Sequence, residues 1–219
     1  MEISFLGHAS FRLRGKNVTI VTDPFNSQMV GIAMPKTTAN IVTISHEHED
    51  HNNADVVKSA GETPVKILRG PGEYEVQGTT IRGVHSWHDT SKGDERGPNT
   101  IFVVELDGIH VAHCGDLGHK LTETQLSEIG NVDIVLIPVG GVYTITPSVA
   151  SEVVSQLEPK VIIPMHYQMG GLNPEGFAKL SGVEEFVKAV GITPQNLPSY
   201  QAKPETLPEE TALVILERK

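Results

Sequence analysis

The sequence has a single cysteine, Cys114, among its 219 residues, so no disulfide can form within the chain. It also lacks the basic segment and long apolar stretch with which a secretory signal would begin. No apolar run approaches the roughly 18–20 residues that a membrane-spanning helix needs. These absences predict a cytoplasmic, reduced protein with no membrane segment, in which Cys114 is a small buried residue.

Basic residues are also scarce: 17 Lys and Arg stand against 27 Asp and Glu, which leaves a formal net charge of −10. The average field of such a chain repels polyanions, so nucleic acid and anionic membranes are unlikely partners, although a local basic pocket remains compatible with it. A small-molecule substrate is the expected partner. The composition gives no indication of the oligomeric state.

The remaining composition is that of a folded globular protein, with 38% hydrophobic and 20% charged residues. The length suits one domain spanning residues 1–219, and the chain has neither a short internal repeat nor a low-complexity tract. Short apolar or alternating runs between glycine and proline turns predict strands. These lie at 3–6, 10–14, 18–22, 41–44, 65–68, 74–76, 79–84, 100–106, 109–113, 132–138, 161–164 and 212–216.

Helices are predicted between these strands. Asn52 or Asn53 is a candidate cap for a short helix through 56–57, Thr122 precedes another, Thr146-Pro147 opens a third that extends to 157, and Gly191 closes a fourth over 183–190. The polar, proline-rich stretch 194–208 is expected to be a surface loop. Many strands with helices on the outside predict a layered α/β fold in which packed sheets are covered by helices.

The pattern His46-x-His48-x-Asp50-His51 directly follows the β-branched strand 41–44. His46 and His48 are two residues apart, so on an extended chain they point the same way and can chelate one divalent ion. Asp50 and His51 lie beyond the strand and can provide ligands at a second metal position nearby. Zinc, manganese or iron would suit these donors. A solvated polar loop is the alternative, and a thermolysin-type helix is excluded because position 50 is not histidine.

This pattern and four others, in the same order, resemble the signature of the metallo-β-lactamase-fold hydrolases. The small branch similar to ascorbate-6-phosphate lactonases, with related proteins of unassigned substrate, is the nearest. The resemblance extends over residues 2–167. The other four segments are Asp23-Pro24, Trp87-His88-Asp89, His113-Cys114-Gly115-Asp116 and Pro164-Met165-His166-Tyr167.

The resemblance implies a four-layer αββα sandwich with metal ligands on loops at one edge of the paired sheets. It further implies two divalent metal ions, with zinc favoured over manganese or iron. One ion would be held by His46, His48 and His88, the second by Asp50, His51 and His166, with Asp116 between the two.

Two cations about 3.5–4 Å apart can share a water molecule and lower its pKa toward neutrality. The predicted function is therefore metal-dependent hydrolysis, in which a metal-bound hydroxide cleaves an ester, lactone or phosphodiester bond of a small molecule. Asp50 is the candidate catalytic residue that orients the hydroxide and accepts its proton. His51 or His166 is expected to steady the leaving-group side.

Other residues have two open interpretations each. His85 and His88 compete for one ligand position, and the His-Asp pair of the resembling family favours His88. His8, Arg96 and Tyr143 are candidates for substrate binding. For His8 the alternative is a structural role, for Arg96 a solvated loop, and for the stretch 140–144 around Tyr143 a tight turn.

Three further histidines are expected outside the ligand set. His113 should be buried and hydrogen-bonded, His119 could support the site from behind, and His110 should lie on the surface.

Competing functions are a nuclease of the same fold and a metal-binding protein without catalysis. The charge of −10 disfavours the nuclease. The complete set of seven candidate ligands disfavours a metal-binding protein without catalysis. A di-iron oxygen or nitric oxide reductase would have glutamate in place of His48 and an added flavin domain, and β-lactam hydrolysis normally requires export.

Overall fold

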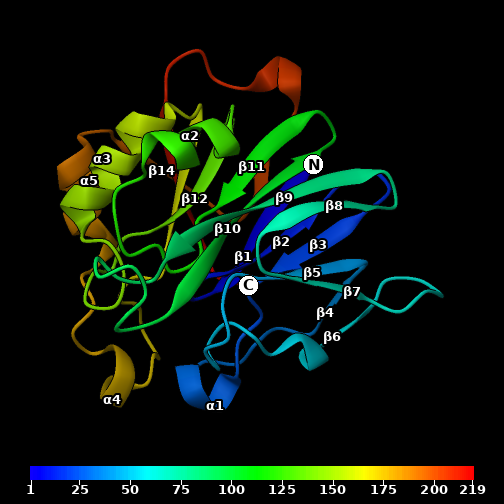
Figure 1. Ribbon diagram of the computed structural model, residues 1–219, viewed down its shortest axis with the longest axis horizontal. Helices are drawn as coiled ribbons and strands as arrows, with labels where there is room; N and C mark the ends of the chain where they lie inside the picture. The colour runs from blue at the N-terminus through cyan, green and yellow to red at the C-terminus, as the bar shows by residue number, and fades with distance from the viewer.

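The computed structural model describes residues 1–219, and its frame is a pair of facing β-sheets (Figure 1). The strand order is β15-β1-β2-β3-β5-β7 in the six-stranded sheet and β14-β16-β13-β12-β11-β10-β9-β8 in the eight-stranded sheet. A third, two-stranded sheet pairs β4 with β6. The predicted class, sheets packed together with helices outside, is confirmed.

The six-stranded sheet contains β1 (Glu2–Gly7), β2 (Ser10–Arg14), β3 (Thr19–Thr22), β5 (Ile41–Ile44), β7 (Lys66–Arg69) and β15 (Tyr200–Gln201). The eight-stranded sheet contains β8 (Gly72–Val76), β9 (Thr79–Trp87), β10 (Pro98–Leu106), β11 (Ile109–His113), β12 (Ile134–Pro138), β13 (Val161–Met165), β14 (Pro194–Leu197) and β16 (Ala212–Leu216). The small pair is β4 (Thr37–Ala39) and β6 (Val57–Ser59).

The helices are α1 (Ser27–Val30), α2 (Glu123–Ile129), α3 (Pro147–Leu157), α4 (Pro174–Phe177) and α5 (Val183–Val190), with 3₁₀ turns η1 (Ala54–Val56) and η2 (Pro204–Thr206). Figure 1 shows α2, α3 and α5 gathered on one side of the molecule, whereas α1 and α4 lie together at one end. None of these helices has the length and apolarity to cross a membrane.

The main core fills the space between the two large sheets. It contains 23 buried apolar residues, among them Phe5 and Phe11 from the six-stranded sheet and Phe102 from the eight-stranded sheet. The rings of Phe5 and Phe11 are 5.1 Å apart. Burying each such side chain contributes about 1.5–3 kcal/mol, so this layer supplies much of the energy that holds the sheets together.

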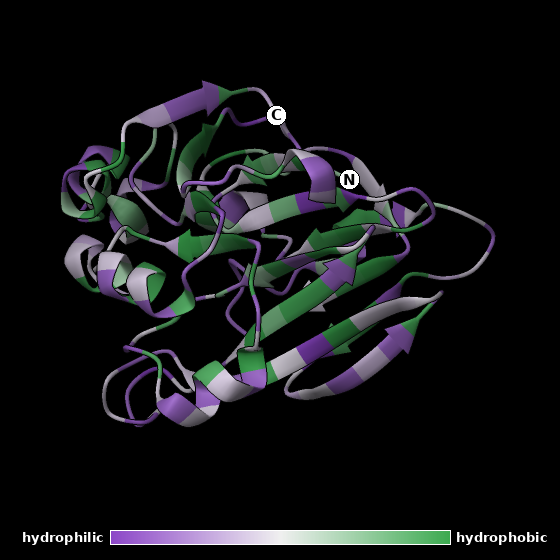
Figure 2. Ribbon diagram, turned by 90° about the horizontal axis from the view of Figure 1, so that it is seen from above, coloured by the Kyte–Doolittle hydropathy of each residue, from purple (hydrophilic) through white to green (hydrophobic).

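The eight-stranded sheet is apolar on both faces. In β12, Ile134 and Leu136 face the core between the sheets, whereas Val135 and Ile137 pack outward into a second cluster that α3 and α5 complete. A strand that is buried on both sides explains the unbroken apolar run in the sequence. Figure 2 shows the hydrophobic strands inside and the mixed polarity of the covering helices.

The outer face of the six-stranded sheet is covered differently. Its outward residues Val21, Val42 and Ile44 pack against Ala54 of η1 and Val57 of β6. The β4–β6 pair and a single 3₁₀ turn therefore occupy the place of a long helix in this outer layer.

The helices α2, α3 and α5 begin or end at the capping residues that the sequence predicted. Thr122 and Gln125 form a capping box at α2, and the side chain of Thr146 accepts a hydrogen bond from the Val149 amide at α3. Gly191 ends α5 with a φ of 71°, which glycine adopts without a Cβ clash.

Two predictions were wrong. The helix expected after Asn52 or Asn53 is only η1, because the Asn53 side chain donates to the Phe25 carbonyl instead of capping, and the chain continues as β6. The stretch 194–208 is not simply a loop: it forms β14, β15 and η2. Both strands pair at sheet edges, where backbone hydrogen bonds need no apolar alternation and proline is tolerated at a strand start.

The directions of the strands in the eight-stranded sheet determine where the candidate ligands lie. Strands β11, β12 and β13 are parallel, and β9 runs the same way because both β9 and β11 are antiparallel to β10. Their carboxyl ends therefore meet at one sheet edge, where ligands bind in open α/β sheets. The Thr100 amide of β10 donates to the Ser45 carbonyl (2.9 Å), which ties the end of β5 to this edge.

We predict that Phe102→Ala will lower the free energy of unfolding by about 3–5 kcal/mol, because the truncation leaves a cavity in a fully buried layer. Ile67→Ala is the control, since Ile67 is 40% exposed, and should cost less than about 1 kcal/mol. Urea unfolding followed by circular dichroism measures both. Equal losses would contradict this assignment of the core.

Candidate metal centre

Four loops, each following a strand, bring seven candidate ligands to one edge of the paired sheets. The loop after β5 carries His46, His48, Asp50 and His51, and the loops after β9, β11 and β13 carry His88, Asp116 and His166. Five of the seven are buried; Asp50 is half-buried and His48 is exposed. Segments up to 120 positions apart in the chain thus converge at the predicted sheet edge.

The Asp116 carboxylate lies at the centre of this cluster. Its Oδ2 is 3.1 Å from His88 Nε2, 3.3 Å from His51 Nε2 and 3.3 Å from His166 Nε2. The Nε2 atom of His46 is 3.9 Å away. One carboxylate oxygen therefore lies close to histidines from all three of the other loops.

The other ligand atoms form two groups around Asp116. The nitrogens of His46, His48 and His88 lie within 4.8 Å of one another. A second group within the same spacing consists of His8, Asp50, His51 and His166. These groups match the two ligand sets that the sequence resemblance implied, with His8 as an additional member of the second.

A buried hydrogen-bond chain behind the cluster orients two of the imidazoles. Asp23 accepts hydrogen bonds from the Ser45 amide (2.8 Å), the Ser45 hydroxyl (2.5 Å) and His51 Nδ1 (2.9 Å). The Ser45 hydroxyl also contacts His46 Nδ1 at 2.9 Å. Because the Ser45 hydroxyl donates to Asp23, it accepts from His46 Nδ1, and the Nε2 atoms of His46 and His51 therefore face the cluster.

Two glycines allow the Asp116 loop to approach its neighbours. A Cβ on Gly115, where φ is 55°, would lie 2.3 Å from Asn99 Oδ1 and 2.5 Å from Ser45 Cβ. A Cβ on Gly118 would lie 2.3 Å from the Asp89 amide nitrogen. The segment around Asp116 can be this close to the loops of His46 and His88 only because both residues lack side chains.

The cluster contains buried polar atoms that have no hydrogen-bond partner. They are Nε2 of His46 and His51, Nδ1 of His88, Oδ1 of Asp116 and both ring nitrogens of His166. Leaving such groups unpartnered costs free energy, and so many in one place is unusual for a folded protein. Imidazole and carboxylate donors on several sides of one small space fit divalent metal ions.

Burial and the neighbouring charged groups shift the pKa values of three histidines in the cluster. Burial and the neighbouring His51 lower the pKa of His46 to about 3, so it is neutral, as a ligand must be. Burial also opposes a charge on His51, but Asp116 and Asp50 outweigh it and raise its pKa. Asp116 similarly raises the pKa of His88 against the effect of burial. Both shifts favour a positive charge on the imidazole next to the buried carboxylate.

The structure separates the two candidates for the ligand after β9. His88 contacts Asp116, whereas the His85 side chain is exposed and packs edge-on against Trp87, with ring centroids 4.2 Å apart. The two residues are an odd number apart near the strand end, so they do not share a direction.

His8 lies behind the cluster and does not line the cleft. It is 1% exposed, its Nε2 is 3.1 Å from Asp50 Oδ2, and its ring is 4.2 Å from that of His166. Burial and His166 lower its pKa to about 4, so at neutral pH the ring is uncharged and Nε2–H donates to Asp50. His8 therefore orients the candidate ligand Asp50 and does not line the cleft that a substrate would enter.

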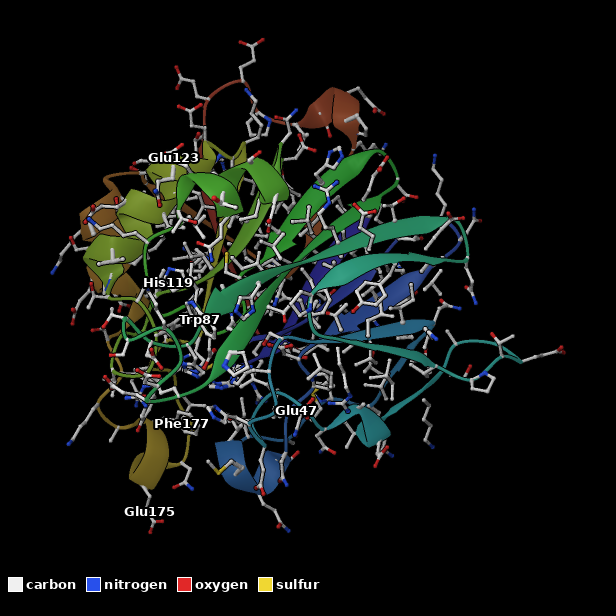
Figure 3. The ribbon with its side chains drawn as sticks, in the orientation of Figure 1. Glu47, Trp87, His119, Glu123, Glu175 and Phe177 are labelled. Carbon is white, nitrogen blue, oxygen red and sulfur yellow. The ribbon has the colours of Figure 1, made fainter.

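Of the remaining histidines, His113 and His119 form hydrogen bonds with backbone groups. His113 is buried, with Nε2 donating to the Ala9 carbonyl and Nδ1 accepting from the Gly115 amide. His119 Nε2 accepts from the Trp87 amide at 3.1 Å, and the two residues lie close together in Figure 3. His110 is partly exposed beside Asp133. Cys114 is completely buried, and its pKa is raised to about 12 by burial.

A cleft of about 440 Å³ opens over the cluster. Its floor includes His48, Asp50, His88, Asp116 and His166, and its walls include Met29, Glu47, Glu49, Arg96, Tyr143, Gly176 and Phe177. Figure 3 shows Glu47 and Phe177 at the end of the molecule where α1 and α4 lie. Arg96 and Tyr143 thus border the cleft, and a space of this size suits a small molecule.

Sequence reasoning missed two residues that position this site. These are Ser45, which links Asp23 to His46, and Asn99, whose Oδ1 accepts from the Asp116 amide at 3.0 Å. Ser45 is adjacent to the candidate ligand His46, which was its only signal. No local pattern pointed to Asn99, because its partner is 17 residues away.

Comparison with known proteins defines the class. A family model described as "Beta-lactamase superfamily domain" matches residues 2–166. A UPF0173 metal-dependent hydrolase from Thermococcus onnurineus is 33% identical, in an alignment that covers 83% of this chain and 92% of the relative. The chain therefore belongs to the beta-lactamase superfamily, within its UPF0173 metal-dependent hydrolase family.

Solved structures agree with this assignment. A candidate Zn-dependent hydrolase of the superfamily from Thermotoga maritima is 38% identical, with a TM-score of 0.81 over 100% of this chain and 99% of the other. Igni18, a metallo hydrolase from Ignicoccus hospitalis, is 21% identical and has a TM-score of 0.67 over 99% and 94% of the two chains, which supports the fold alone.

We predict that zinc binding will release protons at neutral pH and will weaken as the pH falls. The raised pKa values of His51 and His88 mean that the metal-free protein holds protons that a metal must displace. Isothermal titration calorimetry in buffers of different ionisation enthalpy measures the release. A binding enthalpy that is independent of the buffer would contradict the protonation states given above.

We predict that His8→Asn will weaken metal binding at the second ligand group about 10–100-fold, because Asp50 loses the donor that orients it. Asparagine tolerates the left-handed backbone that His8 adopts, with a φ of 56°. His110→Asn is the matched control on the surface. Zinc stoichiometry and affinity from calorimetry should change in the first variant alone, and unchanged binding would refute the supporting role.

Proposed function

We propose that this metal-dependent hydrolase cleaves an ester, lactone or phosphodiester bond of a small molecule at a dinuclear metal centre. The observation that carries the proposal is the position of Asp116, whose Oδ2 lies within 3.3 Å of histidines from both ligand groups at the floor of a cleft. A single metal would need only one of the two groups.

Two sets of residues would hold the metals. His46, His48 and His88 would hold the first, Asp50, His51 and His166 the second, and Asp116 would contact both. Nitrogen and oxygen donors in these numbers favour zinc and would also accept manganese or iron. When bound, such a pair of ions supplies an activated water at neutral pH and polarises the bond to be cleaved.

Asp50 is the proposed proton acceptor. It lines the cleft, and its side chain is 13% exposed, whereas those of the neighbouring ligands His51 and Asp116 are almost completely buried. Burial opposes its ionisation, but His51 and His8 lower its pKa, which keeps it ionised. Oδ2 is held by His8 and lies 3.5 Å from His51 Nε2, so Oδ1 is the oxygen available to take a proton.

His166 is better placed than His51 to steady the leaving-group side. Both rings are buried, but His166 lines the cleft, whereas His51 does not and its Nδ1 is hydrogen-bonded to Asp23. We therefore propose that His51 acts as a ligand only. Of the two residues that the sequence suggested for the leaving-group side, we therefore propose His166.

The cleft favours a small substrate over a nucleic acid. Its volume is about 440 Å³, and the acidic residue Glu49, which forms no ion pair, borders it on a chain of net charge −10. A polyanion would be repelled at this entrance. A lactone, the substrate type of the proteins that the sequence resembles, is one of the bonds proposed. The cytoplasm is the proposed location, since one free cysteine is compatible with a reducing compartment.

The function is tested with the zinc- or manganese-loaded protein and a panel of chromogenic ester, lactone and phosphodiester substrates. Asp50→Ala should lower kcat by about 10²–10⁴-fold, because general-base catalysis contributes an effect of this size. Asp55→Asn, on the exposed turn η1, is the control and should retain activity. A wild-type protein that binds two metals and turns over no member of the panel would favour the non-catalytic alternative.

A further inference from the structure

Arg96 is the only arginine in the walls of the cleft, and it has no acidic partner. Carboxylates form ion pairs with Arg14, Arg69 and Arg82, but none lies within 4.0 Å of Arg12, Arg96 or Arg218. Among these three unpaired arginines, Arg96 is the one that lines the cleft over the candidate metal ligands.

The guanidinium is held from one side by two groups. Its central carbon lies 5.2 Å from the centroid of the Tyr143 ring, and Nη2 donates to the Val142 carbonyl at 3.4 Å. Tyr143 is itself anchored, because its hydroxyl donates to the Gly176 carbonyl at 2.7 Å. The ring face and the carbonyl together fix the plane of the guanidinium.

Val142 adopts a backbone conformation that its side chain disfavours. Its φ is 60° and its side chain is 48% exposed, so apolar burial does not compensate for the left-handed backbone. For a β-branched residue this is an outlier that is held in place by the surrounding structure. The conformation turns the Val142 carbonyl toward Arg96.

The backbone of Arg96 is held from the other side by Asp89, the residue that follows the candidate ligand His88. The Asp89 carboxylate accepts hydrogen bonds from four backbone amides of its own loop, at distances of 2.8–3.1 Å. The last of these amides is that of Arg96. The loop therefore has a fixed shape that sets the position of Arg96 relative to the metal ligands.

Arg96 also borders a second cleft, of about 470 Å³, which shares Glu47 and His48 with the first. The negative charge of Glu47 at this boundary is already balanced, because Arg69 Nη1 contacts both of its carboxylate oxygens at 2.6 and 2.8 Å. The positive charge of Arg96 thus remains unbalanced where the two clefts meet.

We propose that Arg96 binds an anionic group of the substrate, a carboxylate or a phosphate, which does not take part in the reaction. The inference rests on the proposed hydrolysis and names the class of molecule that is hydrolysed: a small ester, lactone or phosphodiester with a separate negative charge. Only one N–H of the guanidinium is used by the protein, so a pair of parallel N–H groups is free for two oxygens of an anion.

The first experiment compares two esters of equal length in the zinc-loaded protein: mono-4-nitrophenyl glutarate, which carries a terminal carboxylate, and 4-nitrophenyl valerate, which does not. The ratio of their kcat/KM values cancels any general loss of activity. Arg96→Gln should reduce the preference for the glutarate ester about 10–100-fold, chiefly through KM, because a charge-assisted bidentate contact is lost. Arg96→Lys should recover only part of it.

Lys92→Gln is the matched control, since Lys92 is an exposed cation of the same loop outside both clefts. It removes the same charge and should leave the ratio of the two esters unchanged. If Lys92→Gln and Arg96→Gln lower the ratio equally, the effect is one of net charge and the proposed contact is refuted.

A second experiment does not depend on hydrolysis. Trp87 is the only tryptophan, and its ring packs against Gly93 in the loop that Asp89 organises. Its fluorescence can therefore report binding of glutarate and, in a separate titration, of inorganic phosphate to the zinc-loaded protein. The tighter of the two identifies the anion, and Arg96→Gln should weaken that binding at least 10-fold at unchanged zinc content.

The two experiments separate the possible failures. If the wild-type protein hydrolyses neither ester, the proposed function is in doubt for this bond type, but the fluorescence titration still decides the role of Arg96. If Arg96→Gln changes neither the ester ratio nor the affinity for either anion, the anion-binding proposal is overturned whatever the activity.

Discussion

The structure at the sheet edge depends on one buried negative charge, the carboxylate of Asp116. It is 2% exposed and lies among imidazoles from three other loops. A carboxylate in such a place is unfavourable unless positive charge comes close to it. The raised pKa values of His51 and His88 favour positive charge on these two rings, and divalent ions would supply it when bound. The same need explains why the loops converge.

The second requirement is that the imidazoles face inward with a free lone pair. The chain from His46 through Ser45 to Asp23, and from Asp23 to His51, meets this requirement for both rings with a single buried carboxylate. Asp23 lies directly after β3, which is parallel to β5, so the strand that carries Asp23 and the strand that carries the histidines end side by side. Orientation of the ligands is thus a consequence of strand pairing.

The loop between β9 and β10 combines two tasks. It begins with His88, contains the carboxylate of Asp89 that hydrogen-bonds four amides, and ends near Arg96 at the cleft wall. A loop built around a buried carboxylate is more rigid than its length and polarity suggest. It can therefore hold a group for substrate binding at a constant position relative to the metal ligands.

The sequence by itself determined most strands of the two large sheets, the helices α2, α3 and α5 and the cluster around His46, because these depend on periodicity, capping chemistry and spacing within a few residues. It also indicated the later segments of Asp116 and His166, through resemblance to a family. It did not reveal the short elements α1, β4, β6 and α4, nor β14 and β15, whose pairing at sheet edges requires only backbone hydrogen bonds. Nor did it reveal the links through Ser45 and Asn99.

Only the tertiary structure decided between His85 and His88, and only it placed His8 behind Asp50 instead of in the cleft. It also showed that Arg96 has no carboxylate partner and lies against Tyr143. Each of these outcomes depends on the direction of a side chain at the end of a strand, or on contacts between segments far apart in the chain. Such contacts arise when the two sheets pack, and no local pattern of residues encodes them.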